Sequence, residues 1–161
     1  MNRAILNSPV GYLEIVENND AIIKINYLEE HVIIKENKLY YLNKTIAQIN
    51  EYFKGKRKQF DLKLKPEGTD FQKEVWKEVL KIPFGETRSY QEIADNLGDP
   101  GAVRAVGNAN GHNPIPILIP CHRVIGSDGK LTGYSGGISR KEWLLKHELT
   151  FSDAEMQLGL F

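Results

Sequence analysis

The chain has a single cysteine in 161 residues, no formal net charge and no long apolar run. One cysteine excludes an internal disulfide and any structural zinc site built from several thiolates. The longest purely apolar stretches are a few residues, far short of the ~20 that a membrane-spanning helix needs. The first residues lack a charged region followed by a long apolar one, so we find no signal peptide and expect an intracellular protein without membrane contact.

The chain has 21 basic and 21 acidic side chains, so its overall charge does not by itself indicate a nucleic-acid partner. Their distribution is uneven, because no acid lies between Asp99 and Asp128. The basic and imidazole side chains of that stretch are Arg104, His112, His122 and Arg123. A surface formed there can approach phosphates without repulsion, although its long-range attraction is weak.

The first sixty residues alternate like a small sheet. Residues 10–15 and 21–27 read as strands on either side of the turn-prone 18–20, and 32–34 is a third apolar run. Apolar residues then recur at helical spacing over 42–53, and Gly55 suits the end of that helix. No catalytic grouping is visible, so we predict a structural N-terminal α/β lobe, 1–63. The basic cluster 54–58 reads as a solvated linker, with nucleic-acid contact as the alternative.

From residue 64 onward the patterns favour helices with explicit starts. Three pairs match the spacing of a capping box: Thr69 with Gln72, Ser89 with Glu92, and Ser139 with Glu142. The first helix presents one apolar stripe and stops before Pro83: Phe71, Val75, Trp76, Val79 and Leu80. Two short helices, 90–97 and 101–110, are separated by a Gly-containing turn. We therefore predict an α+β protein whose C-terminal domain, 64–161, carries a helix-turn-helix at about 89–110.

The helix predicted over 101–110 is made mostly of small residues, with one arginine and no acid. Such a helix can pack closely inside a core. It can equally press its backbone against a nucleic acid, where it would recognise shape more than read bases. The composition leaves both interpretations open.

The segment 113–124 has the densest chemical information. Three prolines stiffen an apolar run that leads to Cys121. A thiol with an ordinary pKa near ~8.5 is mostly protonated at neutral pH, so a nucleophilic cysteine needs a base or a positive charge nearby. His122 is the obvious base, directly or through a water molecule, and Glu148 is the acid best placed to orient it. A lone cysteine can also be simply a small buried apolar residue.

The string Pro120-Cys121-His122-Arg123-Val124 resembles the active-site signature of the O6-alkylguanine-DNA alkyltransferases, the methylated-DNA–[protein]-cysteine S-methyltransferases. Further segments resemble the same family in the same order: 85–94 (GETRSYQEIA), 104–107 (RAVG), 113–115 (NPI), 134–137 (YSGG) and 141–148 (KEWLLKHE). The resemblance covers residues 66 to 150, and the N-terminal lobe more loosely. It implies a ribonuclease H-like N-terminal lobe.

The resemblance also implies a function. Proteins of this family repair DNA by direct reversal: they flip O6-alkylguanine, and by extension O4-alkylthymine, out of the duplex and transfer the alkyl group irreversibly to a cysteine, here Cys121. The reaction is single-turnover and needs no cofactor. The implied partner is double-stranded DNA containing alkylated guanine, and a cytoplasmic or nucleoid-associated monomer without an obligate protein partner is expected. Some relatives hold zinc in the N-terminal lobe; with no cysteine there and only His31, we expect no metal.

The resemblance assigns roles to three groups of residues. The catalytic group is Cys121, His122, Glu148, Tyr90 and Lys141. The DNA-binding group is Arg104, Tyr90, Ala105, Asn113, Arg123 and Gly107. The substrate-pocket group is Pro116, Val124, Tyr134, Ser135 and Gly136.

Within these groups, Arg104 is expected to fill the space that the flipped base leaves, although it could also be a plain phosphate contact. Tyr90 is expected to crowd the neighbouring phosphate and to give a proton to the leaving base, although it could also be a core aromatic residue. The carbonyls of Cys121 and Val124 would accept the exocyclic amine, and the Ser135 N–H would meet the alkylated oxygen. Asn113 is expected to brace a hinge. Lys141 is expected to add positive potential near the sulfur.

Two other functions compete with this one. A non-enzymatic helix-turn-helix sensor of alkylated DNA would bind lesions without any change in its own mass; relatives of that kind lack the cysteine, which this chain has at position 121. A cysteine hydrolase would turn over small esters or amides without DNA. The predicted helix-turn-helix and the acid-free stretch count against the hydrolase.

Overall fold

The computed structural model describes residues 1–29 and 40–159, and the chain divides into two compact units. The N-terminal unit contains Met1–Glu67 together with Pro114–Leu118, and the C-terminal unit contains Gly68–Asn113 together with Ile119–Phe161. Within the described ranges, no helix combines the length and apolar character that crossing a membrane requires.

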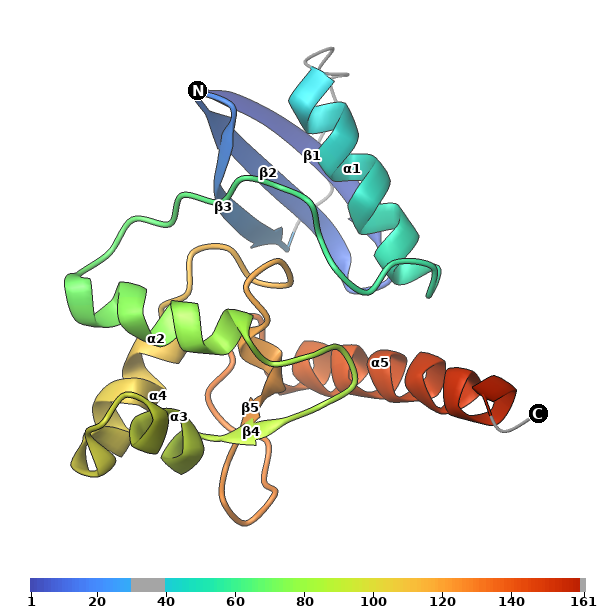
Figure 1. Ribbon diagram of the computed structural model, residues 1–161. Coiled ribbons are helices and arrows are strands. Elements are labelled where there is room, and N and C mark those ends of the chain that lie inside the picture. The colour runs from blue at the N-terminus through green and yellow to red at the C-terminus, as the bar shows by residue number, and fades with distance from the viewer. Residues whose placement is uncertain (30–39, 160–161) are drawn as a thin grey trace. The chain divides into compact units, whose positions relative to one another are not determined.

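The N-terminal unit is built on an antiparallel meander of β1 (Asn2–Ser8), β2 (Gly11–Asn18) and β3 (Ala21–Leu28), in the order β1-β2-β3 (Figure 1). The predicted strands and the turn between them are confirmed, and Asn19 and Asp20 adopt the positive φ values that this tight turn needs. β1 was not predicted, because only Ala4 of its residues is buried and no alternation is visible. The third apolar run, 32–34, and His31 lie outside the described residues.

Helix α1 (Tyr40–Phe53) completes this unit and ends before Gly55, whose φ of 76° is the left-handed conformation expected after a helix. Two further segments are hydrogen-bonded to β3. Ile22 exchanges backbone hydrogen bonds with Lys63 and Lys65, and the Ile25 N–H donates to the carbonyl of Pro114 (2.9 Å). The segment that precedes the cysteine is therefore anchored to this sheet. The core of the unit consists of buried apolar side chains that include Leu13, Ile15, Ile22, Leu42, Ile49 and Tyr52.

The C-terminal unit is mainly helical. Its elements are α2 (Asp70–Leu80), β4 (Arg88–Ser89), α3 (Tyr90–Asn96), the 3-10 turn η1 (Pro100–Ala102), α4 (Val103–Gly111), the 3-10 turn η2 (Cys121–Arg123), β5 (Val124–Ile125) and α5 (Ile138–Gly159). β4 and β5 form a short parallel pair in which Arg88 lies opposite Val124. This pair joins the segment before α3 to the segment that follows the cysteine.

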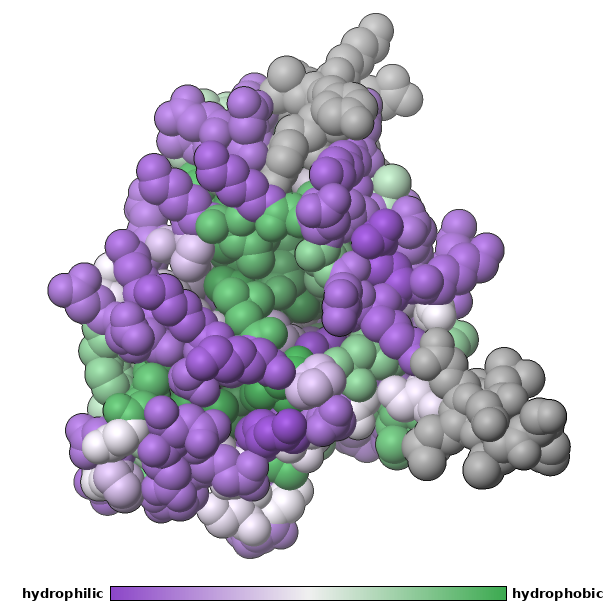
Figure 2. All heavy atoms as spheres, viewed as in Figure 1, coloured by the Kyte–Doolittle hydropathy of each residue, from purple (hydrophilic) through white to green (hydrophobic). Residues whose placement is uncertain are grey.

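Helix α2 begins with the predicted capping box: the Thr69 hydroxyl accepts from the Gln72 N–H (3.1 Å), and the Gln72 side chain accepts from the Thr69 N–H (2.9 Å). A cap of this kind stabilises a helix by about 1 kcal/mol. Its apolar stripe is narrower than predicted, because Val75, Trp76 and Val79 are buried whereas Phe71 and Leu80 are 38% and 47% exposed. Figure 2 shows mostly hydrophilic side chains over α2.

The other two predicted caps differ from each other. Ser89 caps α3, since its hydroxyl accepts from the Glu92 N–H at 3.0 Å. The cap predicted at Ser139 is wrong, because α5 begins at Ile138 and the Lys141 N–H already donates to the carbonyl of Gly137. Helix α5 continues without a break to Gly159.

Helices α3 and α4 pack on one another across η1, and α4 also packs on α2. The Trp76 indole N–H donates to the carbonyl of Ala109 (2.9 Å), which fixes α4 from its buried side. Val106, Ala109 and Asn110 form that side, and the opposite side is solvent-exposed. The small-residue helix is therefore packed on one face and open on the other.

Candidate active site

The Cys121 side chain is held at the start of η2, directly after Pro120. Its backbone N–H donates to the carbonyl of Ile119 (2.7 Å), and the Arg123 N–H donates to the carbonyl of Pro120 (2.9 Å). These bonds define a tight turn whose three side chains are all buried, and Cys121 itself is 1% exposed. The predicted nucleophile is thus presented from a dry, rigid turn.

The thiol of Cys121 is protonated in the resting protein. Burial raises its pKa to about 11, while a hydrogen bond from the Asn113 side chain, the charge of Lys141 and the backbone amides of Cys121 and His122 lower it. At pH 7 about one molecule in ten thousand would then carry a thiolate. A nucleophilic role therefore requires a base that takes the proton during the reaction.

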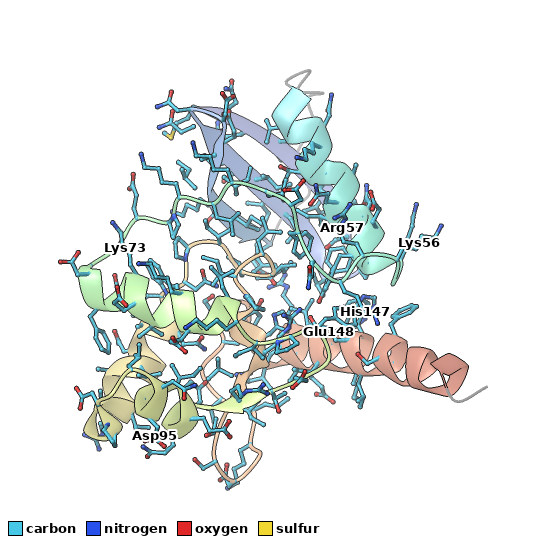
Figure 3. The ribbon with its side chains drawn as sticks, viewed as in Figure 1. Lys56, Arg57, Lys73, Asp95, His147 and Glu148 are labelled. Atoms are coloured by element: carbon cyan, nitrogen blue, oxygen red, sulfur yellow. The ribbon has the colours of Figure 1, made fainter. Side chains whose placement is uncertain are left out.

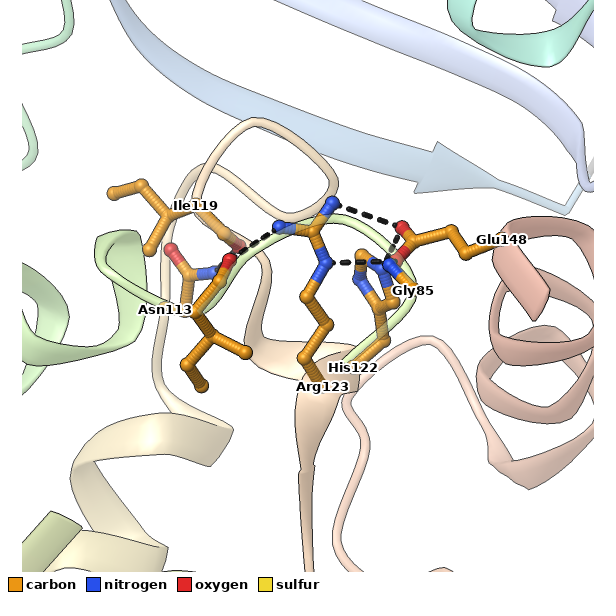
Figure 4. Close-up of polar contacts among 7 residues, drawn as sticks. Gly85, Asn113, Ile119, His122, Arg123 and Glu148 are labelled. Atoms are coloured by element: carbon orange, nitrogen blue, oxygen red, sulfur yellow. Dashed lines mark hydrogen bonds and ion pairs between the residues drawn. The ribbon is translucent and has the colours of Figure 1, made fainter. Parts of the chain in front are cut away.

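Glu148 on α5 is the centre of a buried hydrogen-bond network (Figures 3 and 4). One carboxylate oxygen accepts from Arg123 Nε (2.7 Å) and from the Gly85 N–H (3.1 Å). The other accepts from His122 Nε2 (2.6 Å) and Arg123 Nη2 (3.0 Å). Burial alone would raise the pKa of Glu148, but the charges and hydrogen bonds of His122 and Arg123 outweigh it and hold that pKa well below its usual range. Glu148 is therefore an ionised anchor rather than a proton acceptor.

The His122 imidazole is fully buried beside this carboxylate. Since an ionised carboxylate only accepts hydrogen bonds, Nε2 carries the hydrogen in this pair. Burial lowers the pKa of His122, Glu148 raises it, and the charges of Arg123 and Lys141 lower it further. The neutral ring leaves the Nδ1 lone pair as its acceptor, and Nδ1 has no hydrogen-bond partner among residues 1–29 and 40–159. The arrangement provides a base of fixed tautomer next to Cys121 in the chain.

Lys141 lies about two helical turns before Glu148 on α5, and it is equally buried. Its ammonium group donates to the carbonyls of Val124 (2.6 Å) and Thr132 (2.9 Å) and lies 5.8 Å from the centre of the Tyr90 ring. The Tyr90 hydroxyl donates to the same Thr132 carbonyl (3.1 Å). Burial lowers the pKa of Lys141 to about 8, while interaction with Cys121 raises it. Three of the predicted catalytic side chains, Cys121, Lys141 and Tyr90, are thus linked.

Two asparagines brace the turn that carries the cysteine. Asn113 is buried and donates from Nδ2 to the carbonyl of Ile119 (2.8 Å). Asn110, on the buried side of α4, donates from Nδ2 to the carbonyl of Cys121 (3.2 Å). Asn113 was predicted both to contact DNA and to brace a hinge, and its amide makes this hydrogen bond inside the unit.

Arg123 also needs correction. Its side chain is 7% exposed and its guanidinium is held by Glu148 and by the carbonyl of Ile82 (Nη1, 2.7 Å). A group committed in this way cannot reach a phosphate, so Arg123 belongs to the buried network and not to the DNA-binding group. Sequence reasoning missed this because the acid-free stretch around Arg123 favoured a surface position, while its partner lies 25 residues later.

The open face of α4 carries the remaining DNA-binding predictions. The exposed residues of η1 and α4 repeat at helical spacing: Gly101, Arg104, Ala105 and Asn108. Gly107 lies beside them, and a Cβ there would come within 3.8 Å of the Tyr90 ring, an ordinary contact. The structure therefore brings Arg104, Ala105, Gly107 and Tyr90 to adjacent positions on α3 and α4.

The predicted pocket residues divide between the units. In the C-terminal unit Val124 and Tyr134 are buried, whereas Ser135 is exposed and Gly136 half-buried. Pro116 is buried and belongs to the N-terminal unit. The carbonyls predicted to accept a base amine, those of Cys121 and Val124, already accept from Asn110 and Lys141; a carbonyl oxygen has two lone pairs and can take a second donor.

Sequence reasoning assigned no role to two backbone groups of the site. The Gly85 N–H holds Glu148, and the Thr132 carbonyl holds both Lys141 and Tyr90. Gly85 has a φ of 81°, and a Cβ there would overlap the Ser152 side chain. Its position in a Pro-Phe-Gly turn was the available signal. The Thr132 carbonyl left none.

Comparison with known proteins identifies the family. Residues 70–150 match the DNA binding domain of 6-O-methylguanine DNA methyltransferase, and residues 1–66 match its ribonuclease-like domain. The chain belongs to the 6-O-methylguanine DNA methyltransferase family. A methylated-DNA–protein-cysteine methyltransferase of Methanosarcina barkeri is 51% identical over 150 residues, which cover 89% of this chain and 94% of the relative. A protein of the same name from Mycobacterium bovis is 46% identical, covering 95% of each chain.

Solved structures of the family have the same architecture. The O6-methylguanine methyltransferase of Mycobacterium tuberculosis superimposes with a TM-score of 0.86 at 45% identity, covering 98% of both chains. The same organism's protein in complex with DNA gives 0.84 at 46% identity, covering 94% of both chains. The predicted α+β class, with an N-terminal sheet lobe and a C-terminal helical lobe, is confirmed. Among the described residues, no group of three or more His, Cys, Asp or Glu side chains could hold a metal ion.

Proposed function

We propose that this protein repairs DNA by direct reversal, moving the alkyl group of O6-alkylguanine onto Cys121 in a single irreversible event. The observation that carries the proposal is one buried cysteine followed by a neutral histidine whose tautomer is fixed by an ionised glutamate, in a chain of this family. O4-alkylthymine, which presents an alkylated oxygen in the same way, is the second substrate. The implied site of action is the cytoplasm or nucleoid, and the protein acts as a monomer.

The two lobes have separate tasks in this proposal. The N-terminal lobe, 1–63, is structural, and the C-terminal domain, 64–161, carries both DNA binding and chemistry. α3 and α4 form the helix-turn-helix, whose exposed face meets the duplex. A lesion base lies within the stack, so it must rotate out before a cysteine can reach it, at a cost of a few kcal/mol. Arg104 on the exposed face fills the space left behind, and Tyr90 crowds the adjacent phosphate.

The transfer step follows from the site's proton arrangement. The Cys121 proton passes through a water molecule to Nδ1 of His122, and the resulting thiolate attacks the alkyl carbon. The S–C bond forms as the C–O6 bond breaks, and the electron pair of that bond returns to the base. The Tyr90 hydroxyl gives a proton to a ring nitrogen, so guanine leaves neutral. Lys141 stabilises the negative charge on sulfur as it develops. The thioether that remains is not reversed, so each molecule acts once.

Val124, Tyr134, Ser135 and Gly136, all of the C-terminal unit, would line the pocket for the flipped base. The exposed Ser135 N–H would meet the alkylated oxygen. The carbonyls of Cys121 and Val124 would take the exocyclic amine as a second donor. These assignments rest on motif correspondence and on the positions described above.

The decisive experiment is the intact mass of the protein after it is mixed in equal amounts with a duplex containing one O6-methylguanine. We expect a gain equal to replacing one hydrogen with a methyl group, located on Cys121, with plain guanine left in the DNA. Cys121→Ala should bind the same duplex and gain no mass. An unchanged wild-type mass together with lesion-selective binding would support the sensor alternative instead. A methyl group found on another residue would refute the proposed nucleophile.

A further inference from the structure

The Arg123 side chain is directed entirely into the protein. Its guanidinium makes a two-point contact with Glu148, from Nε to one oxygen (2.7 Å) and from Nη2 to the other (3.0 Å), while Nη1 donates to the Ile82 carbonyl (2.7 Å) (Figure 4). Its Cζ atom lies 5.8 Å from the centre of the Phe84 ring. A two-point arginine–carboxylate contact fixes orientation as well as charge. Arg123 therefore determines where the carboxylate of Glu148 lies.

This contact also changes the charge balance around His122. The charged groups that act on the imidazole are Glu148 and Lys141 from α5 and Arg123 from η2. A buried carboxylate alone at 2.6 Å would favour the imidazolium form, because an opposite charge stabilises the charged state of a histidine. Arg123 already provides a positive charge next to Glu148, so Glu148 does not need a protonated His122 as its counter-charge. The pair of Glu148 and Arg123 is then neutral, and His122 keeps a hydrogen bond without gaining a proton.

The proton count matters because His122 must accept a proton from Cys121. An imidazole that is already protonated offers no lone pair at Nδ1. A glutamate that is itself protonated would no longer fix the histidine tautomer. A working site therefore needs Glu148 charged and His122 neutral at the same time, which two isolated buried groups would not maintain.

We propose that Arg123 is a positioning residue for alkyl transfer: it keeps Glu148 ionised and prevents the His122–Glu148 pair from taking up a proton, so that His122 remains a base. This inference rests on the proposed function for its effect on transfer. The effect of Arg123 on the protonation of His122 and Glu148 in the free protein does not depend on that function.

The first test is an NMR titration of the histidine ring signals of the whole protein, with His122 assigned through a His122→Asn variant. In the wild-type protein we expect His122 to stay neutral down to acid pH. In Arg123→Met the His122–Glu148 pair should take up a proton at a clearly higher pH, because Glu148 has lost its counter-charge. The single-turnover rate constant for O6-methylguanine in duplex DNA should fall roughly 10- to 100-fold at neutral pH. It should recover as the pH rises, and the affinity for undamaged duplex should stay unchanged.

A second variant separates proton control from packing. Arg123→Met leaves a buried carboxylate unpaired and can destabilise the fold, whereas Arg123→Met with Glu148→Gln removes both charges. The glutamine oxygen can still accept the His122 hydrogen bond. We expect the double variant to keep His122 neutral and to transfer the alkyl group several-fold faster at neutral pH than Arg123→Met. Arg57→Met is the matched control, since it removes an arginine–glutamate pair from the N-terminal unit (3.1 Å to Glu51) and should change neither readout.

Three results would overturn the proposal. His122 could titrate at the same pH with and without Arg123; the double variant could be no faster than the single one; or DNA affinity and transfer rate could fall equally, which would return Arg123 to the DNA interface. A wild-type protein that transfers no alkyl group would refute the proposed function instead. The histidine titration would then still decide the role of Arg123, because it needs no DNA.

Discussion

At the scale of single residues, burial keeps Cys121 and His122 uncharged although charged side chains lie beside them. Cys121 holds its proton although Lys141, Asn113 and two backbone amides favour its loss, because burial outweighs them. His122 is neutral beside a carboxylate. The thiol of the resting protein is therefore unreactive. In the proposed reaction the Cys121 proton moves to His122 once an alkylated guanine is bound.

The thiol can be titrated directly, since the chain has one cysteine. We expect the ultraviolet thiolate absorbance, taken as wild type minus Cys121→Ser, to appear with a midpoint pH of about 11. A midpoint near the ordinary value for cysteine would mean that the thiol is not desolvated as described.

Glu148 links the same network to stability. Its pKa in the folded protein lies below the unfolded value, so its contribution to the free energy of unfolding is complete above about pH 4.5 and is lost as the pH falls further. We expect Glu148→Gln to cost roughly 3 kcal/mol or more at pH 7, because it leaves Arg123 without its counter-charge. Urea unfolding of both proteins between pH 7 and acid should show this difference shrinking below about pH 4. A difference that does not depend on pH would exclude a charged Glu148.

At the scale of elements, the turn between α2 and β4 is tied to α5. Gly85 supplies the N–H that holds Glu148, and its positive φ brings the backbone against Ser152. The turn at Gly85 therefore holds the Glu148 carboxylate in place. Position 85 must lack a side chain for two reasons: the positive φ and the close approach of Ser152.

Gly85→Ala should consequently lower the free energy of unfolding by more than the cost of placing an alanine at a positive φ. Gly129 has nearly the same φ (80°) but nothing within 4 Å of its missing Cβ, so Gly129→Ala measures the conformational cost, about 1–2 kcal/mol. We expect Gly85→Ala to exceed it by at least ~1 kcal/mol in urea unfolding, through overpacking. A Ser152→Ala background should recover part of that excess. Equal costs at the two glycines would show that the Ser152 contact relaxes freely.

The open face of α4 makes a separate prediction. Arg104→Ala should slow methyl transfer from O6-methylguanine in duplex DNA at least ~10-fold, about 1.4 kcal/mol, because the flipped state loses the side chain that replaces the base. Reaction with the free O6-alkylguanine base, measured with the same mass assay, should change little. Lys73→Ala, which removes an exposed cation from α2, is the control (Figure 3). Equal losses on both substrates would exclude the flipping role.

At the scale of the whole molecule, the fold class and most elements followed from local patterns. Alternation predicted β2 and β3, helical spacing predicted α1 and α2, and the caps at Thr69 and Ser89 marked real helix starts. The cap at Ser139 misled because the same residue spacing occurs inside a helix, where the backbone hydrogen bonds are already satisfied. Local patterns specify an element when one face is buried and leave its ends to tertiary contacts.

The sequence predicted which side chains belong to the candidate site, but not the hydrogen bonds and ion pairs that join them. The motif around Cys121 predicted that residue as the nucleophile, and the motif's neighbours predicted the histidine and the glutamate. Arg123 was misassigned because its partner lies on a distant helix, and no local pattern reports a long-range ion pair. The backbone donors and acceptors at Gly85 and Thr132 left almost no sequence signal, because hydrogen bonds from the main chain do not depend on residue type.

The zero net charge of the chain also has a kinetic consequence. Without a large positive field, DNA is not attracted from far away, and association depends on the local acid-free surface. We expect the association rate constant with undamaged duplex to change less than ~10-fold between low and physiological salt, measured by stopped-flow fluorescence. A steeper dependence would indicate a concentrated cationic surface.

The single cysteine has a further consequence for a population of these molecules. Because only one thiol exists and it is almost completely shielded from solvent, casual oxidants and small electrophiles seldom reach it, and a change at this atom marks an encounter with a lesion. The alkylated fraction of a sample is then a count of past events, and the unmodified fraction is the capacity left. The protein would serve as a dosimeter whose reading is stored in its own covalent structure.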